Sequence, residues 1–162
     1  MSARIHDAAV HASHVPSLKR AIVPAPTPRS VLVIEDETLT ALAITETLER
    51  DGYDVLGSTG DAQEALRLAA AKPDFAVVDI RLGDGGSGLE VGRLLACQGV
   101  TVLYATAYGV GFRQEMEDSG GRACLQKPFS VSDLSDALSA LDELRRGELP
   151  QRVPPAFHLF LD

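Results

Sequence analysis

The sequence predicts an α/β protein built on a doubly wound, five-stranded parallel sheet. Five short runs rich in β-branched residues alternate with segments that have the apolar spacing of helices, the pattern of repeated strand–helix units. Three runs, at 31–35, 74–80 and 100–106, are apolar at successive positions and are therefore expected to be buried on both faces. The chain has 162 residues, of which 45% are hydrophobic, enough for one domain with a core and too few for two large ones.

The expected elements follow one another along residues 30–147. Strands are expected at VLVIE (31–35), YDVLGS (53–58), DFAVVDI (74–80), VTVLYAT (100–106) and ACLQ (123–126). Helices are expected over 38–50, 61–71, 88–97 and 131–145. Asp61 can cap the second helix, with Glu64 returning the bond, and Ser130 can cap the last one. The segment 109–121 predicts a short, weak fourth helix, because each interior glycine costs about 1 kcal/mol relative to alanine.

Two segments are expected to lie outside this domain, a leader over 1–29 and a tail over 148–162. The leader ends in PAPTPR, whose alternating prolines favour an extended, solvated linker. The tail ends in an apolar patch that could pack on the domain or dock on a partner, and its members are Phe157, Leu159, Phe160 and Leu161. Neither segment is long enough for a DNA-binding output domain, so we expect a stand-alone protein.

Composition excludes several classes of function. A net charge of −8 opposes attraction to nucleic acid or to an anionic membrane. No apolar run approaches the roughly 20 residues of a membrane span and no secretory signal is present, so we expect a cytoplasmic protein. Cys97 and Cys124 have no zinc-site spacing. All four histidines lie outside residues 30–150, which excludes Ser/His/Asp triads and Cys/His pairs there.

Polar residues gather where the buried runs end. Glu35 and Asp36 end the first run, Asp79 ends the third, Thr106 ends the fourth and Lys127 follows the fifth. Ligands of open α/β sheets bind beyond the carboxyl ends of the strands. We therefore expect these five residues to form one site.

Such a site suits magnesium and a phosphoryl group. Converging carboxylates repel one another unless a cation lies among them, and a site made only of oxygens suits Mg²⁺. The cation and a lysine can neutralise the oxygens of a transferring phosphoryl group while an aspartate attacks phosphorus in line, giving an acyl phosphate. An ionised carboxylate needs no general base, which agrees with the missing histidines.

The segments VLVIEDE, FAVVDI, YATAYG and LQKPF, at these separations, resemble the receiver (CheY-like) domain of two-component response regulators. The resemblance covers about residues 29–146. It implies a flavodoxin-like fold with strand order 2-1-3-4-5 and a cis Lys127–Pro128 bond. It also implies phosphotransfer from the phosphohistidine of a histidine kinase or phosphotransfer protein.

The resemblance also implies a role for each residue of the site. Asp79 would be the phosphoacceptor, and Thr106 and Lys127 would contact its phosphoryl group. The ligands of Mg²⁺ would be Asp36 directly, Glu35 largely through water, Asp79 and the backbone carbonyl of Arg81.

Two positions depart from the pattern of receivers. Cys124 stands three residues before Lys127, where receivers usually carry an aromatic residue, and Tyr104 or Tyr108 could substitute for it. Gly83 replaces the usual proline in the loop after Asp79, which should make that loop more mobile.

We therefore expect a phosphoacceptor signalling domain that catalyses only its own phosphorylation and dephosphorylation. Phosphorylation is expected to rearrange the loop after Thr106 and to shift the fourth helix. Output would pass through protein contacts, including a possible homodimer through the face formed by the fourth helix, fifth strand and fifth helix.

Three alternatives were weighed against this interpretation. A pseudo-receiver would keep the fold for protein contacts without phosphorylation, although the complete set of site residues opposes it. The GDGGSG segment at 83–88 matches a dinucleotide fingerprint, but no acid occurs at 91–114 to bind ribose. A haloacid dehalogenase-like hydrolase would need an acid where Arg81 stands.

Overall fold

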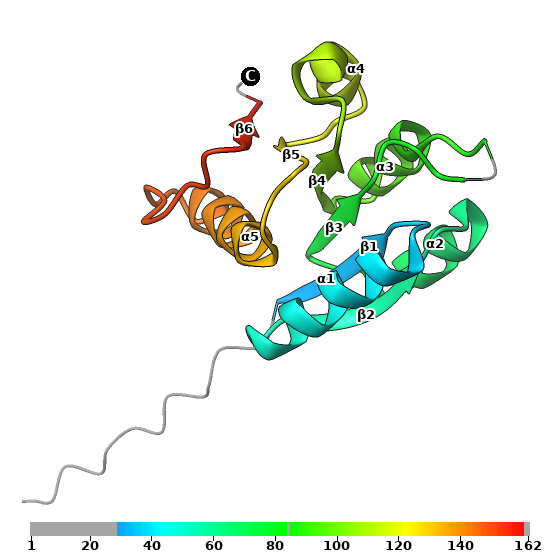
Figure 1. Ribbon diagram of the computed structural model, residues 1–162, viewed down its shortest axis with the longest axis horizontal. Coiled ribbons are helices and arrows are strands. Elements are labelled where there is room, and N and C mark those ends of the chain that lie inside the picture. Colours follow the sequence, from blue (N-terminus) through cyan, green and yellow to red (C-terminus); the bar gives the residue numbers. More distant parts are fainter. Residues whose placement is uncertain (1–28, 84, 161–162) are drawn as a thin grey trace, which may run out of the picture.

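A six-stranded sheet lies between two layers of helices in the computed structural model (Figure 1), which describes residues 29–83 and 85–160. The strands are β1 (Ser30–Ile34), β2 (Asp54–Thr59), β3 (Phe75–Val78), β4 (Thr101–Thr106), β5 (Ala123–Gln126) and β6 (Phe157–Leu159). Residues 1–28 of the expected leader lie outside the described residues.

The helices connect successive strands. They are α1 (Thr38–Arg50), α2 (Ala62–Leu68), α3 (Gly88–Cys97), α4 (Arg113–Asp118) and α5 (Val131–Arg145), with short 3-10 turns at Ala69–Ala71 and Gly109–Phe112. Among the described residues, no helix is both long and apolar enough to cross a membrane.

The strand order is β2-β1-β3-β4-β5-β6, which confirms the doubly wound order expected for the first five strands. Those five strands are parallel, and a helix connects each of them to the next along the chain. The sixth strand was not expected. It comes from the segment predicted as a tail and pairs antiparallel with β5, placing Leu159 opposite Ala123 and Phe157 opposite Leu125.

Both faces of the sheet are buried, because successive side chains of a strand point to opposite sides. Leu32 and Ile34 of β1 belong to one apolar cluster, which also contains side chains from α2 and α3. Val31 and Val33 belong to a second cluster with side chains from α1 and α5. The clusters explain why β1, β3 and β4 have continuous apolar runs.

Side-chain caps define the start of two helices. Ser130 and Asp133 form a complete capping box at α5, with each side chain accepting a hydrogen bond from the other residue's backbone N–H. At α2, Asp61 accepts from the Glu64 N–H at 2.7 Å as expected. The Asp61 N–H donates to the Thr59 hydroxyl at 3.0 Å, so the predicted return bond from Glu64 is replaced by one from the preceding strand.

Helix α4 has six residues, which agrees with the short fourth helix predicted from the flanking glycines. Gly120 ends it with a φ of +83°, a conformation that other residues adopt only with strain. Gly121 then passes so close to the Tyr104 ring that an added Cβ would lie 2.6 Å from it. The end of α4 is thus fixed by a turn and by packing on β4.

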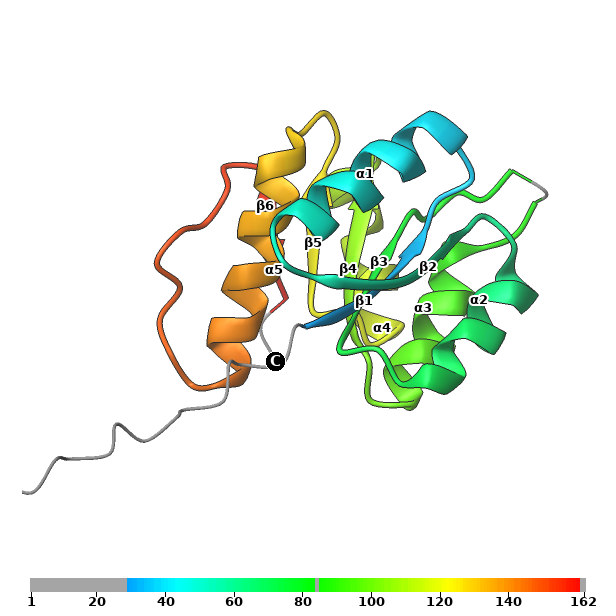
Figure 2. The same ribbon diagram turned by 90° about the horizontal axis from the view of Figure 1, so that it is seen from below.

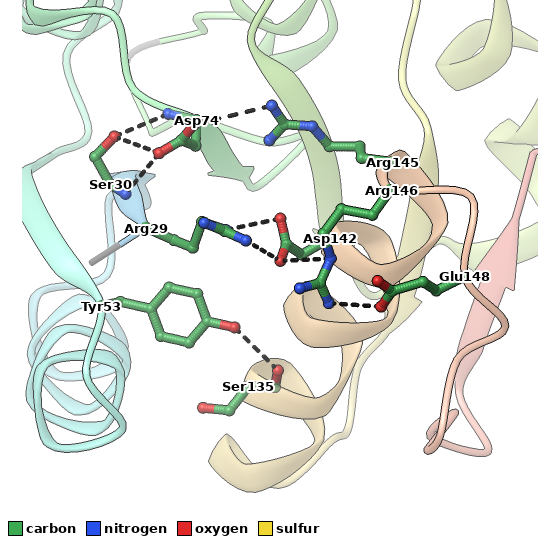
Figure 3. A network of polar contacts seen from close by, with 9 residues as sticks. All are labelled: Arg29, Ser30, Tyr53, Asp74, Ser135, Asp142, Arg145, Arg146 and Glu148. Carbon is green, nitrogen blue, oxygen red and sulfur yellow. Dashed lines mark hydrogen bonds and ion pairs between the residues drawn. The ribbon is translucent and has the colours of Figure 1, made fainter. Parts of the chain in front are cut away.

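An ion-pair network ties the amino end of the sheet to α5 (Figure 3). The Arg29 guanidinium donates to both carboxylate oxygens of Asp142, at 2.8 and 2.6 Å. This guanidinium holds the pKa of Asp142 below its ordinary value, and Arg146 lies 3.7 Å from the same carboxylate. Arg29 thereby links the start of β1 to the last turns of α5.

Replacement of Arg29 by alanine is expected to lower the free energy of unfolding by about 1 kcal/mol at neutral pH, because a bidentate, partly buried pair is lost. Because the pKa of Asp142 is lower in the folded protein than its ordinary value of 3.8, the ion pair contributes fully to stability at pH values above 3.8. That contribution is lost as the pH falls through the pKa of Asp142 in the folded protein. The difference between wild type and Arg29→Ala in urea unfolding should therefore be full at pH 7 and should shrink as the pH is lowered below 3.8. Arg93→Ala, which removes an exposed pair within α3, is the matched control and should leave stability unchanged.

Candidate functional site

The five residues predicted from the strand ends surround the carboxyl edge of the sheet. Glu35 and Asp36 follow β1, Asp79 follows β3, Thr106 is the last residue of β4, and Lys127 follows β5. Strand pairing places β3 between β1 and β4, with β5 beyond β4. The acidic residues thus come from neighbouring strands, and the lysine comes from the other side of β4.

Lys127 holds two of the acids. Its Nζ lies 2.6 Å from Asp79 Oδ2 and 2.9 Å from Glu35 Oε2. Burial lowers the pKa of Lys127, but the hydrogen bonds to Asp79 and Glu35 outweigh that effect, so its pKa is raised above the ordinary value. The lysine is therefore a permanent cation in this site.

Backbone donors fix the other oxygen of each acid. Asp79 Oδ1 accepts from the Arg81 N–H at 3.1 Å, and Glu35 Oε1 accepts from the Glu37 N–H at 3.1 Å. Each carboxylate is thus held at both oxygens, once by the lysine and once by the chain just after it. This local arrangement is typical of acids at turns, where side chains bond the backbone two residues on.

Asp36 lies between two glycines. A Cβ at Gly60 would lie 2.7 Å from the Asp36 Cα, and a Cβ at Gly83 would lie 2.7 Å from Asp36 Oδ2. The first contact is with backbone and cannot be relieved by a side-chain rotation, whereas the second would force the carboxylate to turn. The glycine that replaces the usual proline of receivers thus gives the Asp36 carboxylate its space.

A hollow of about 600 Å³ opens beside Asp36, and the loop after β3 forms one wall. That loop is closed by hydrogen bonds from the Gly88 N–H to the Ile80 carbonyl at 2.9 Å and from the Leu82 N–H to the Gly86 carbonyl at 3.4 Å. Arg81 and Tyr108 line the same hollow.

The donor set can be tested against Mg²⁺. In residues 29–83 and 85–160, no three His, Cys, Asp or Glu side chains come together as a metal-binding group, and Glu35 is bonded to Lys127 instead. Mg²⁺ does not need such a group, because it keeps several waters and is bound by one or two carboxylates. Asp36, which lines the hollow, therefore fits the cation. Asp79 and Glu35 are both bonded to Lys127, so each would share its carboxylate between the lysine and the cation.

Thr106 connects the site to the loop before α4. Its side chain is buried, and Oγ1 accepts from the Tyr108 N–H at 3.2 Å. The Tyr108 ring lies 4.8 Å from the Arg81 guanidinium and 5.5 Å from the Phe112 ring, edge to face. Sequence reasoning missed this contact between the loops after β3 and β4, because no local pattern indicates which loop residues meet.

Of the two tyrosines named as substitutes for the missing aromatic residue, Tyr104 pairs with Cys124 across β4 and β5, whereas Tyr108 lies in the loop after β4. Tyr104 is buried, and its hydroxyl is 2.6 Å from Ser119 Oγ. Tyr108 is exposed beside Arg81. The apolar cluster that contains Tyr104 and Cys124 also includes Phe160, just after β6. The Lys127–Pro128 bond is cis, as the resemblance implied.

A mostly parallel sheet with an acid pair, an aspartate, a threonine and a lysine at its carboxyl edge is typical of one class of α/β signalling domains. Comparison with known families agrees, since the response regulator receiver domain family matches residues 31–139. The chain belongs to this family. Receiver domains are signalling domains of two-component systems and typically bind Mg²⁺ at their acidic site.

Curated relatives are response regulators. The transcriptional regulatory protein PdtaR of Mycobacterium tuberculosis (strain CDC 1551 / Oshkosh) is 35% identical over 114 residues, which are 68% of this chain and 55% of PdtaR. The polar-differentiation response regulator DivK of Brucella anthropi is 33% identical over 110 residues, covering 64% of this chain and 88% of DivK. This chain therefore spans about half the length of PdtaR.

Solved structures show the same fold. The signal receiver domain of a modulated diguanylate cyclase from Desulfovibrio desulfuricans G20 has a TM-score of 0.66 at 30% identity, covering 75% of this chain and 99% of that one. A response regulator protein from Burkholderia pseudomallei, with a phosphorylated aspartic acid, calcium ion and citrate, has a TM-score of 0.63 at 30% identity, covering 74% and 72%.

Lys127→Met is expected to lower the free energy of unfolding by about 2 to 4 kcal/mol, because it leaves two largely buried carboxylates without their cation. Because the pKa of Lys127 is higher in the folded protein than its ordinary value of 10.5, its ion pairs contribute fully to stability at pH values below 10.5. That contribution is lost as the pH rises through the pKa of Lys127 in the folded protein. Chemical denaturation should therefore give the same loss at pH 7 and pH 9. Lys72→Met, at an exposed position, is the control; equal stability of the two variants would contradict the bridging role of Lys127.

Proposed function

We propose that this receiver accepts a phosphoryl group on Asp79 from the phosphohistidine of a histidine kinase or phosphotransfer protein. The observation that carries the proposal is the 2.6 Å contact between Lys127 Nζ and Asp79 Oδ2, at the carboxyl edge of the sheet. A charged lysine beside Asp79 places positive charge where the phosphoryl oxygens arrive. The phosphorylated aspartic acid of the Burkholderia pseudomallei relative supports the same chemistry here.

Each residue of the site has a part in this transfer. An ionised Asp79 oxygen attacks phosphorus in line, a P–O bond forms as the P–N bond to the donor histidine breaks, and the imidazole leaves with that electron pair. Lys127 moves its contact to a phosphoryl oxygen, and the Thr106 hydroxyl donates to another. Hydrolysis of the acyl phosphate by water returns the carboxylate and releases phosphate, so the domain acts only on itself.

In this proposal, Mg²⁺ offsets the negative charge of the carboxylates and of the phosphoryl group. Its ligands would be Asp36, Asp79 and the backbone carbonyl of Arg81, with Glu35 acting largely through water because Lys127 holds it. When bound, the cation neutralises charge on the phosphoryl oxygens.

Asp79→Asn is expected to abolish phosphorylation while keeping the fold, because the amide has nearly the same shape and is not a nucleophile. The measurement is intact-protein mass after incubation with acetyl phosphate or phosphoramidate and Mg²⁺. Wild type should gain one phosphoryl mass, and the variant none. A label that persists in the variant would refute the assignment of Asp79.

A folded wild-type protein that takes no label from these donors, or from a phosphohistidine donor, would instead identify a pseudo-receiver that works by protein contact alone. Omission of Mg²⁺ is the third arm of the measurement. Labelling at an equal rate without Mg²⁺ would contradict the proposal that the acidic residues bind this cation for the transfer.

The surface beside Asp36 suits a protein donor. Leu39 and Leu42 lie in the first turns of α1, directly after Asp36, and their side chains are 75% and 51% exposed. Leu42 also lines a hollow of about 370 Å³ that contains Asp36 and Gly60. Exposed leucines next to an acidic site are expected where a partner is held while its phosphohistidine reaches the acceptor.

Leu39→Asp is expected to slow phosphotransfer from a phosphohistidine protein by about tenfold or more, because burial of a leucine stabilises a complex by about 1.5 to 3 kcal/mol. Labelling by acetyl phosphate, which needs no docking surface, should not change. Leu149→Asp is the matched control, since Leu149 is also an exposed leucine, at 90%, but lies just after the carboxyl end of α5. Equal transfer rates for the two variants would place the donor elsewhere.

We further propose that output passes through protein contacts over the face formed by α4, β5 and α5, a second copy of this chain being one possible partner. The net charge of −8 disfavours direct output to nucleic acid. Strand β6 covers part of this face.

A further inference from the structure

The outer edge of β5 is occupied by the chain's own C-terminal segment. After α5 the chain runs back along that helix, as Figure 2 shows, and then forms β6. The Gln151 N–H donates to Glu143 Oε2 at 2.8 Å, which fixes the returning segment on α5. The Phe160 N–H donates to the Arg122 carbonyl at 2.9 Å, and the Gln126 N–H donates to the Ala156 carbonyl at 3.0 Å, which closes both ends of the β5–β6 pair.

The β5–β6 pairing involves fewer residues than the pairings between the other strands. β6 has three residues, all only partly buried, and it pairs with one strand. Short edge strands with few buried contacts open at low free-energy cost. Additional contacts must therefore decide whether β6 stays on the sheet.

One arginine of α4 supplies such contacts. The Arg113 Nη2 donates to the Leu159 carbonyl at 3.3 Å, and its guanidinium lies 5.2 Å from the centre of the Phe160 ring. The same side chain is paired with Glu117 on α4 at 2.7 Å, which sets its direction. Phe160 is only 4% exposed and belongs to the cluster that includes Met116 of α4 and Cys124 of β5. The position of α4 therefore determines how firmly β6 is held.

Helix α4 is in turn connected to the phosphoacceptor site. Phe112, the residue before Arg113, packs against Tyr108, and the Tyr108 N–H donates to the Thr106 hydroxyl. Tyr108 also lies under Arg81, two residues after Asp79. A short chain of contacts thus runs from Asp79 and Thr106 through Tyr108 and Phe112 to the start of α4.

We infer that β6 is an intramolecular latch over the β5 edge, held by Arg113 and released when Asp79 is phosphorylated. A phosphoryl group offers the Thr106 hydroxyl a charged acceptor, which is stronger than a neutral one. Movement of Thr106 toward it shifts Tyr108, Phe112 and the short helix behind them. Arg113 then leaves the Leu159 carbonyl and the Phe160 ring, and β6 separates from β5. The inference rests on the proposed phosphorylation of Asp79.

Amide hydrogen exchange of the full chain tests the latch in two arms. In the first, without any phosphoryl donor, Arg113→Ala should speed exchange of residues 156–160 about tenfold, because one hydrogen bond to a charged group and one cation–π contact are lost. Arg152→Ala is the matched control, since Arg152 lies on the same C-terminal segment but pairs with Asp136 of α5 at 3.6 Å. Equal exchange in the two variants would overturn the role of Arg113.

In the second arm, wild type and Asp79→Asn are compared with Mg²⁺ and acetyl phosphate, and the label is counted by intact mass in the same samples. Phosphorylated wild type should exchange residues 156–160 faster by a similar factor, with β1 and β3 unchanged, and Asp79→Asn should not respond. A labelled protein with unchanged exchange overturns the latch and leaves the proposed function standing. A protein that takes no label here or from a phosphohistidine donor overturns the proposed function, and phosphorylation-driven release with it.

Discussion

The pairing of Lys127 with two acids is the interaction on which the site depends. Side chains that end β1 and β3 place negative charge at one edge of the sheet, and such charges are costly to bring together in a partly buried place. A lysine from the far side of β4 offsets this cost, with Nζ 2.6 Å from Asp79 and 2.9 Å from Glu35. In the proposed transfer, the ammonium that stabilises the fold also exchanges one of these contacts for a phosphoryl oxygen, so stability and the proposed chemistry share one cation.

The rest of the architecture keeps this edge in place. β1, β3 and β4 are buried on both faces, so a shift of any one of them would disturb two apolar clusters at once. The other side of the molecule is less constrained. α4 has six residues between glycine-bearing turns, and β6 has three. The strands that hold the charges are thus firmly packed, while the elements on the α4 side are shorter and more weakly held.

Much of the fold could be predicted from sequence because its signals are local. The helices at 38–50, 88–97 and 131–145 begin and end where apolar spacing and capping residues such as Ser130 place them. The site residues were found because acids that follow buried runs must meet at one edge. β6 could not be predicted in this way, since a three-residue strand has no period of its own and forms only by pairing with β5. The orientation of Glu35 toward Lys127, and the stacking of Arg81 on Tyr108, likewise depend on how separate loops meet.

Asp36 lies between Gly60 and Gly83, where an added Cβ would meet the Asp36 backbone and the Asp36 carboxylate respectively. Every replacement of glycine by another amino acid adds that atom, whatever its polarity or charge. A survey of inactivating mutations in this chain should therefore recover two positions that carry no functional group at all. More positions of the acidic site are therefore sensitive to mutation than carry reactive groups, because the site also needs the space that Gly60 and Gly83 leave for Asp36.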